Sequence, residues 1–127
     1  MFRGIDAVLL YSNDPKKLAD FYKEKVGIEN EMTGEYGDDP LDVFYMFNVG
    51  DSKQFGVLHH SKIKGKNKEP FRYMINFEVK NIEETVGRLK KNKVKLIQDI
   101  YHVEDYGKIA TFEDIDGNYF QIVQVRP

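Results

Sequence analysis

The side chains with the clearest capacity for chemistry are three histidines and one glutamate. His59 and His60 close an apolar run, His102 lies further along the chain, and Glu78 is the only carboxylate on its face of an alternating segment. Imidazole and carboxylate groups can hold a divalent metal ion or transfer protons. A Glu78–His60 pair could act as a general base, although a lone histidine on a strand is more often structural.

The absence of cysteine excludes several kinds of site. The 127 residues contain none, so a disulfide framework, a thiolate metal site and a cysteine nucleophile are impossible. Hydrophobic residues make up 41% and charged residues 31% of the chain. This length and mixture are typical of one folded domain, which we expect over residues 1–127.

Charge and hydropathy restrict the partners. The net charge is −2, too small to attract nucleic acid, although four lysines form a local basic stretch in residues 61–70. No apolar run approaches the roughly 20 residues that span a membrane, and the first residues carry no signal-peptide pattern. We expect a cytoplasmic protein with no nucleic-acid or membrane partner.

The first half of the sequence is predicted to form a strand, a helix and a hairpin. An apolar run at 8–10 precedes Asp14-Pro15, which is typical of a helix start, and Gly27 fits a left-handed helix end. Residues 30–42 are predicted to be a loop with one weak strand. The hairpin is predicted to join 44–49 to 55–58 through a turn at Gly50-Asp51.

The second half repeats this plan. A strand with alternating apolar residues over 72–79 leads to a helix, where Asn81 and Glu84 have capping-box spacing. Residues 109–113 and 119–123 form a final hairpin around Asp116-Gly117-Asn118. A single offset of 67 positions relates the halves and pairs Ala7 with Met74 and Gly50 with Gly117. The predicted parts are a first repeat at 2–60, a linker at 61–70 and a second repeat at 71–126.

Two motifs on this duplicated βαβββ plan carry a family resemblance. Asp20-Phe21-Tyr22 late in the first helix and Asp114-Ile115-Asp116-Gly117-Asn118 before the last strand resemble the glyoxalase, bleomycin-resistance and dioxygenase (vicinal oxygen chelate, VOC) superfamily. Ile115 departs from the proline usual there. The resemblance implies an α+β fold in which two βαβββ repeats form a cup-shaped curved sheet.

The resemblance also implies where a metal ion would bind. Catalytic members hold one divalent ion with four His or Glu side chains, from the first and last strands of each repeat. The matching positions here are Ala7, Gln54 or Gly56, Met74 and Gln121. Methyl, thioether and amide groups are poor ligands for a hard ion, so we expect no metal cofactor.

Strand alternation predicts the lining of the cup. Alternate residues of the strand at 72–79 form one wholly apolar set, which belongs under the helix, and one mixed set, which should face the cup. By the same alternation, His60 is expected to face the cup and His59 to point the other way. Either Tyr45 with Phe47 or Phe44 with Met46 adds aromatic wall. The expected ligand-binding residues are Leu9, Tyr11, Gln54, Leu58, His60, Met74, Asn76, Glu78 and Gln121, with Val123 beside them.

Two functions are compatible with this lining. The first is a non-catalytic protein that binds a small molecule, of the sequestration or resistance type, as in the drug-binding members of the superfamily. The second is a glyoxalase-like lyase or isomerase, or a dioxygenase, with a non-standard metal site drawn from His60, Glu78 and Glu113. Alternatively, Leu9, Leu58 and Met74 simply fill the cup as core. The sequence leaves open whether the protein is an enzyme.

The resemblance also implies a homodimer, because the cups of the family commonly pair through their outer strands and open strand edges invite pairing. Whether one chain closes its own cup or exchanges halves with a second is left open. We expect a ligand that is aromatic or otherwise apolar and binds between Asn76 and Gln121.

Overall fold

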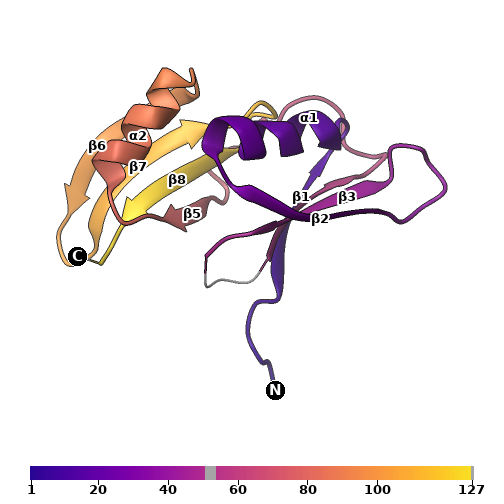
Figure 1. Ribbon diagram of the computed structural model, residues 1–127, viewed down its shortest axis with the longest axis horizontal. Helices are drawn as coiled ribbons and strands as arrows, with labels where there is room; N and C mark the ends of the chain where they lie inside the picture. The colour runs from indigo at the N-terminus through magenta and orange to yellow at the C-terminus, as the bar shows by residue number, and fades with distance from the viewer. Residues whose placement is uncertain (51–53, 127) are drawn as a thin grey trace. The chain divides into compact units, whose positions relative to one another are not determined.

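The computed structural model describes residues 1–50 and 54–126, which form two compact units (Figure 1). The units are Met1–Gly65 and Lys66–Pro127, so their boundary falls inside the predicted linker at 61–70. Each unit contains a four-stranded sheet and one helical segment. The α+β fold with two βαβββ repeats is confirmed.

The sheet of the first unit is mixed. Its strands are β1 (Ala7–Ser12), β2 (Glu29–Glu35), β3 (Val43–Asn48) and β4 (Gln54–His59). The order is β1-β4-β3-β2, with β1 parallel to β4 and the other pairs antiparallel. The weak strand predicted within 30–42 therefore exists as β2, and only residues 36–42 remain a loop.

The helix of the first unit begins and ends at the predicted residues. The Asp14 carboxylate accepts a hydrogen bond from the Lys17 amide at 3.2 Å, and Gly27 has a φ of 93°. Between them the chain forms α1 (Pro15–Asp20) and then a π-helical segment, η1 (Phe21–Val26). The helical spacing of the sequence did not reveal this change of hydrogen bonding.

The second unit repeats the arrangement. Its strands are β5 (Ile75–Glu78), β6 (Lys95–Val103), β7 (Gly107–Glu113) and β8 (Tyr119–Gln124), in the order β5-β8-β7-β6. The strand predicted over 72–79 is shorter than expected. Arg72 lies in a bend, and Tyr73 and Met74 have no regular secondary structure.

Helix α2 (Ile82–Lys91) crosses one face of this second sheet (Figure 1). Its start is capped as predicted, because the Asn81 side chain accepts a hydrogen bond from the Glu84 amide at 3.0 Å. The Ile82 amide donates to the Gln124 side chain at 2.9 Å, which ties the helix start to β8. None of the helices among the described residues could span a bilayer by length and apolarity.

Each unit buries one face of its sheet against its own helical segment. In the first unit Tyr22 contacts the Phe55 ring, with centroids 5.0 Å apart, above a buried layer that includes Leu10 and Val57. In the second, Ile82, Val86 and Leu89 of the helix are buried, and the rings of Phe77 and Phe120 on the facing strands have centroids 6.0 Å apart. Burial of each such side chain contributes about 1.5–3 kcal/mol. The opposite face of each sheet is called here its open face.

The linker is fixed to the last hairpin of the second unit. The Asn67 amide donates to the Asp116 carbonyl at 2.7 Å, and its side chain donates to Asn118 at 3.1 Å. Gly117 has a φ of 81°, and a Cβ there would lie 3.0 Å from the Asn67 carbonyl oxygen. The predicted turn is confirmed; the turn predicted at Gly50-Asp51 includes Asp51, which lies outside the described residues.

The strand registers correct the single offset of 67. Leu9 pairs with Gly56 in the first sheet, whereas Asn76 pairs with Gln121 in the second. Leu9 and Asn76 are 67 positions apart, but Gly56 and Gln121 are only 65 apart. The offset of 67 holds for the first strands and helix starts and is wrong for the last two strands of each unit. Met46 and Thr111, which pair with Gly56 and Gln121, are also 65 positions apart, so the difference in length arises between the helix start and the third strand.

Candidate functional site

The open face of the first sheet is apolar along β1. Leu9 and Tyr11 are 39% and 42% exposed, whereas their neighbours Leu10 and Ser12 are buried on the α1 side. On β4, Leu58 pairs with Tyr11 and shares its face. These three candidate residues therefore lie together on one surface of the unit.

The register of β3 decides which aromatic residues join them. Met46 pairs with Gly56, so Phe44 and Met46 point to the open face. Tyr45 pairs with Val57, which places Tyr45 and its alternate neighbour Phe47 on the α1 side. The sequence had left this choice open.

Strand pairing shows that Gly56 corresponds to Gln121. The second expected metal-ligand position is therefore Gly56 and not Gln54. A Cβ at Gly56 would lie 2.5 Å from the Met46 sulfur and 2.9 Å from the Leu9 Cδ2 atom. The two side chains therefore occupy the space that a metal-binding side chain would fill. Gln54, paired with Ala7, is exposed two residues earlier on β4.

The open face of the second sheet is more polar. The Gln121 amide group donates to the Thr111 hydroxyl at 3.0 Å, and the Asn76 amide group donates to the Tyr106 hydroxyl at 3.3 Å. Val123, on the same face, is buried. Met74 is half-buried and precedes β5 rather than lying within it. Sequence reasoning missed Tyr106, which the β6–β7 turn carries to Asn76.

Glu78 is paired with an arginine that the sequence patterns did not indicate. The Arg126 Nε and Nη2 atoms lie 2.6 and 3.1 Å from the two carboxylate oxygens. Hydrogen bonding and charge from Arg126 lower the pKa of Glu78. A carboxylate held in this way is a weaker base, so the geometry argues against Glu78 as a general base. Glu113, the other carboxylate considered, lies 3.8 Å from the Lys95 ammonium group.

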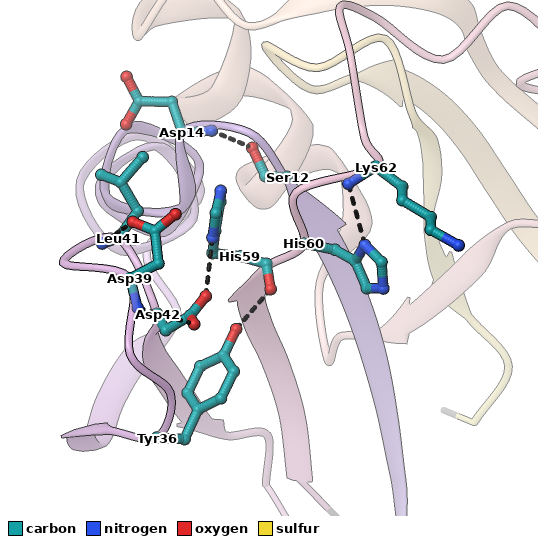
Figure 2. A network of polar contacts seen from close by, with 9 residues as sticks. All are labelled: Ser12, Asp14, Tyr36, Asp39, Leu41, Asp42, His59, His60 and Lys62. Atoms are coloured by element: carbon teal, nitrogen blue, oxygen red, sulfur yellow. Dashed lines mark hydrogen bonds and ion pairs between the residues drawn. The ribbon is translucent and has the colours of Figure 1, made fainter.

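His60 lies just beyond β4 and packs against Tyr11. The two rings meet edge to face, with centroids 5.7 Å apart and planes at 83°. The Lys62 amide donates a hydrogen bond of 3.1 Å to His60 Nδ1 (Figure 2). The neutral ring therefore carries its proton on Nε2, which makes that nitrogen a donor and not a metal ligand.

His59 belongs to a separate network on the other side of β4, as its parity predicts. The ring is buried, its Nδ1 atom lies 2.8 Å from the Asp42 carboxylate, and its carbonyl oxygen accepts a hydrogen bond from the Tyr36 hydroxyl (Figure 2). Burial raises the pKa of Tyr36, and the nearby Asp42 carboxylate acts in the same direction. These contacts fasten the 36–42 loop to the end of β4. The acidic composition of the loop was the only sign of this contact in the sequence.

Metal-binding groups do not gather in the part of the chain that the structure describes. Across residues 1–50 and 54–126 no three His, Asp or Glu side chains form a group that could hold a metal ion. His102, the third histidine, is exposed on β6 and pairs with Lys108 on the α2 side of its sheet. The residues at the inherited metal positions thus do not fit a divalent ion.

The candidate residues are divided between the units. The first unit carries Leu9, Tyr11, Gln54, Leu58 and His60. The second carries Met74, Asn76, Glu78 and Gln121. Strand pairing brings Leu9, Tyr11, Gln54 and Leu58 to one face of the first sheet, and Asn76, Glu78 and Gln121 to one face of the second. His60 lies just beyond β4 and Met74 just before β5, and Glu78 is paired with Arg126.

One related sequence and several related structures match this chain over nearly its whole length. An uncharacterized protein of Bacillus subtilis (strain 168), YetH, is 26% identical over 120 residues, covering 94% of this chain and 97% of YetH. TnmS3, described as an antibiotic binding protein from Streptomyces sp. CB03234, has a similar fold with a TM-score of 0.72 at 14% identity; the match covers 98% of each chain.

A second structure with this fold contains a metal ion. A point mutant of the fosfomycin resistance protein FosX of Listeria monocytogenes, complexed with Mn(II), matches with a TM-score of 0.71 at 16% identity, over 97% of this chain and 90% of FosX. At such identities the likeness shows the fold alone. The sequence model of the Glyoxalase/Bleomycin resistance protein/Dioxygenase superfamily matches residues 4–122. The chain belongs to this superfamily.

Proposed function

We propose that this chain is a small-molecule-binding member of the superfamily that does not use a metal ion. The observation that carries the proposal is the set of side chains at the inherited metal positions, above all Gly56, which lies under Met46 and Leu9. A lyase, isomerase or dioxygenase of the family type needs charged or imidazole ligands there. Without them the exposed face can still bind a ligand but cannot polarise one through a metal.

The composition of the open face in the first unit supports binding. Leu9, Tyr11 and Met32 are exposed to between 39% and 49%, and Phe44 and Met46 lie on the same side of the sheet. Exposed aromatic, aliphatic and thioether groups on a rigid sheet suit an apolar ligand with a flat surface. TnmS3 is named as an antibiotic binding protein with this fold, which supports a sequestration role for the class.

The ligand we propose is an aromatic or otherwise apolar compound of modest size. On the second unit, taken by itself, the amide groups of Asn76 and Gln121 are the polar groups proposed to contact such a compound, and Met74 is the proposed apolar contact. Both amides already have hydrogen bonds to hydroxyl groups, so their positions are fixed before a ligand arrives. Fixed polar groups beside an apolar surface provide orientation at little entropic cost.

The test is an equilibrium binding measurement by calorimetry with a panel of apolar aromatic compounds, in the presence of EDTA. We expect saturable binding of at least one compound, which mass spectrometry then recovers chemically unchanged. Leu9→Asp should weaken binding, whereas Ile115→Asp, at a turn residue of nearly equal exposure, should leave it intact. Conversion of a compound only after metal is added would contradict the proposal and favour the enzyme.

We also propose that the protein works as a homodimer. Within its own sheet each of β1, β2, β5 and β6 pairs on one side only, which leaves backbone donors and acceptors for another strand.

A further inference from the structure

We propose that His60 is a specificity-determining hydrogen-bond donor that selects aromatic ligands with an oxygen acceptor, such as a carbonyl or phenolate oxygen. This inference rests on the proposed binding function and adds a ligand class to it. It assigns His60 a role opposite to the base or metal ligand that the sequence suggested.

The direction of the hydrogen bond follows from the backbone. The amide of Lys62 can only donate, so His60 Nδ1 must accept at their separation of 3.1 Å. A neutral imidazole with an accepting Nδ1 carries hydrogen on Nε2. Moving the proton to Nδ1 would bring two N–H groups together and lose the bond, so the backbone fixes the tautomer.

The donor on Nε2 is available to a ligand. The His60 ring is exposed, and among the described residues no second hydrogen bond to this ring is found. The edge-to-face contact with Tyr11 holds the ring in place. Figure 2 shows His60 turned away from the network around the buried His59.

The neighbours of the donor define the rest of the ligand. Tyr11 and its strand partner Leu58 present ring and aliphatic surface on the face that His60 continues. The Tyr11 hydroxyl has no hydrogen-bond partner within residues 1–50 and 54–126, so it can donate beside His60 Nε2. Two donors at the end of an apolar surface favour a flat ligand with an electron-rich oxygen at its rim and disfavour a cation.

The experiment uses the fluorescent naphthyl ketone prodan, whose emission shifts to the red when its carbonyl oxygen accepts a hydrogen bond, and ethylnaphthalene, a hydrocarbon with the same ring system. Binding of each probe is measured for the full chain and for His60→Phe. The substitution keeps an aromatic ring beside Tyr11 but removes the donor. We expect it to weaken prodan binding about three- to tenfold, the cost of one neutral hydrogen bond, and to shift its bound emission to the blue.

Two matched variants isolate the donor. His60→Gln places an amide N–H near the position of Nε2 and should restore most of the prodan affinity and the red emission. His102→Phe removes the exposed histidine of β6, which pairs on the α2 side of its sheet, and should change neither. Ethylnaphthalene should bind the full chain and His60→Phe equally.

The possible failures are distinct. If the full chain binds both probes and His60→Phe binds prodan unchanged, or loses both probes equally, the donor role is overturned and the binding function stands. If the full chain binds neither probe, the donor role and the proposed apolar binding surface are both overturned.

Discussion

Gly56 and Gln121 occupy equivalent positions on the last strands of the two sheets, but their surroundings differ. Gly56 is covered by apolar side chains, and Gln121 has its amide group on Thr111. Met46 and Thr111 are also equivalent, because Met46 pairs with Gly56 and Thr111 pairs with Gln121. In both units, a side chain from the neighbouring strand therefore contacts the residue at the expected metal-ligand position, where a metal ion would otherwise bind.

The ion pair of Glu78 yields a prediction for Arg126→Met. Hydrogen bonding and charge from Arg126 hold the pKa of Glu78 below its ordinary value, so this carboxylate keeps its charge to lower pH than a free one. The contact stabilises the fold above the ordinary glutamate pKa, and this contribution is lost as pH falls through the lowered value. In the variant the pKa should rise toward the ordinary range.

Carbon-13 NMR of the Glu78 carboxyl group over an acid titration checks this. Lys108→Met, which should raise the pKa of Glu83 in the same way, serves as the matched control for the method. An unchanged Glu78 titration in Arg126→Met would show that the ion pair does not persist in solution.

Side chains hold the 36–42 loop in addition to the backbone hydrogen bond of 3.0 Å from the Tyr36 amide to the Asp42 carbonyl oxygen. Tyr36 donates to the His59 carbonyl, and Asp42 pairs with the buried His59 ring. The same loop separates β2 from β3, which carries Phe44 and Met46. The network therefore lies directly before the strand that carries this wall of the open face.

Asp42→Ala tests this anchoring. It leaves His59 Nδ1 buried without its partner, and we expect a loss of about 1–3 kcal/mol in the free energy of unfolding. Asp38→Ala, at an exposed carboxylate of the same loop, should change the stability by less than about 0.5 kcal/mol. Urea denaturation of the unsubstituted protein and of the two variants measures both changes in the free energy of unfolding. Equal stabilities would contradict the anchoring role.

Local patterns predicted the helix ends well because the signals are local. Asp14, Gly27 and Asn81 act through bonds to residues at most five positions away. The wall formed by Phe44 and Met46 could not be predicted, since a run of apolar residues has no polar face to orient it. The register with β4 decides it instead.

Contacts between distant residues account for what sequence reasoning missed at the candidate site. Asp42 is 17 positions from His59, and Arg126 is 48 positions from Glu78, distances at which sequence spacing carries no signal. The duplicated plan was visible in the sequence, but a two-residue difference between the repeats hid the equivalence of Gly56 and Gln121. Only strand pairing reveals such a shift.

The edge strands of the two sheets predict how the protein assembles in solution. Each sheet has two edge strands, β1 and β2 in the first and β5 and β6 in the second, and bulges interrupt the registers of β2 and β6. We expect a homodimer in solution, because open edges and exposed apolar surface are stabilised by pairing. Sedimentation equilibrium over a dilution series should give twice the chain mass at the higher concentrations, and a constant monomer mass would contradict the dimer.

The metal content of the protein distinguishes a metal-free binding protein from a metal-dependent enzyme. The chain is incubated with an excess of zinc, nickel, iron or manganese in turn, desalted, and analysed by elemental mass spectrometry against protein concentration. Ala7, Gly56, Met74 and Gln121 supply neither charge nor imidazole nitrogen, so we predict far less than one ion per chain for every metal. One tightly held ion per chain would contradict the account and would make a metal-dependent enzyme the better description.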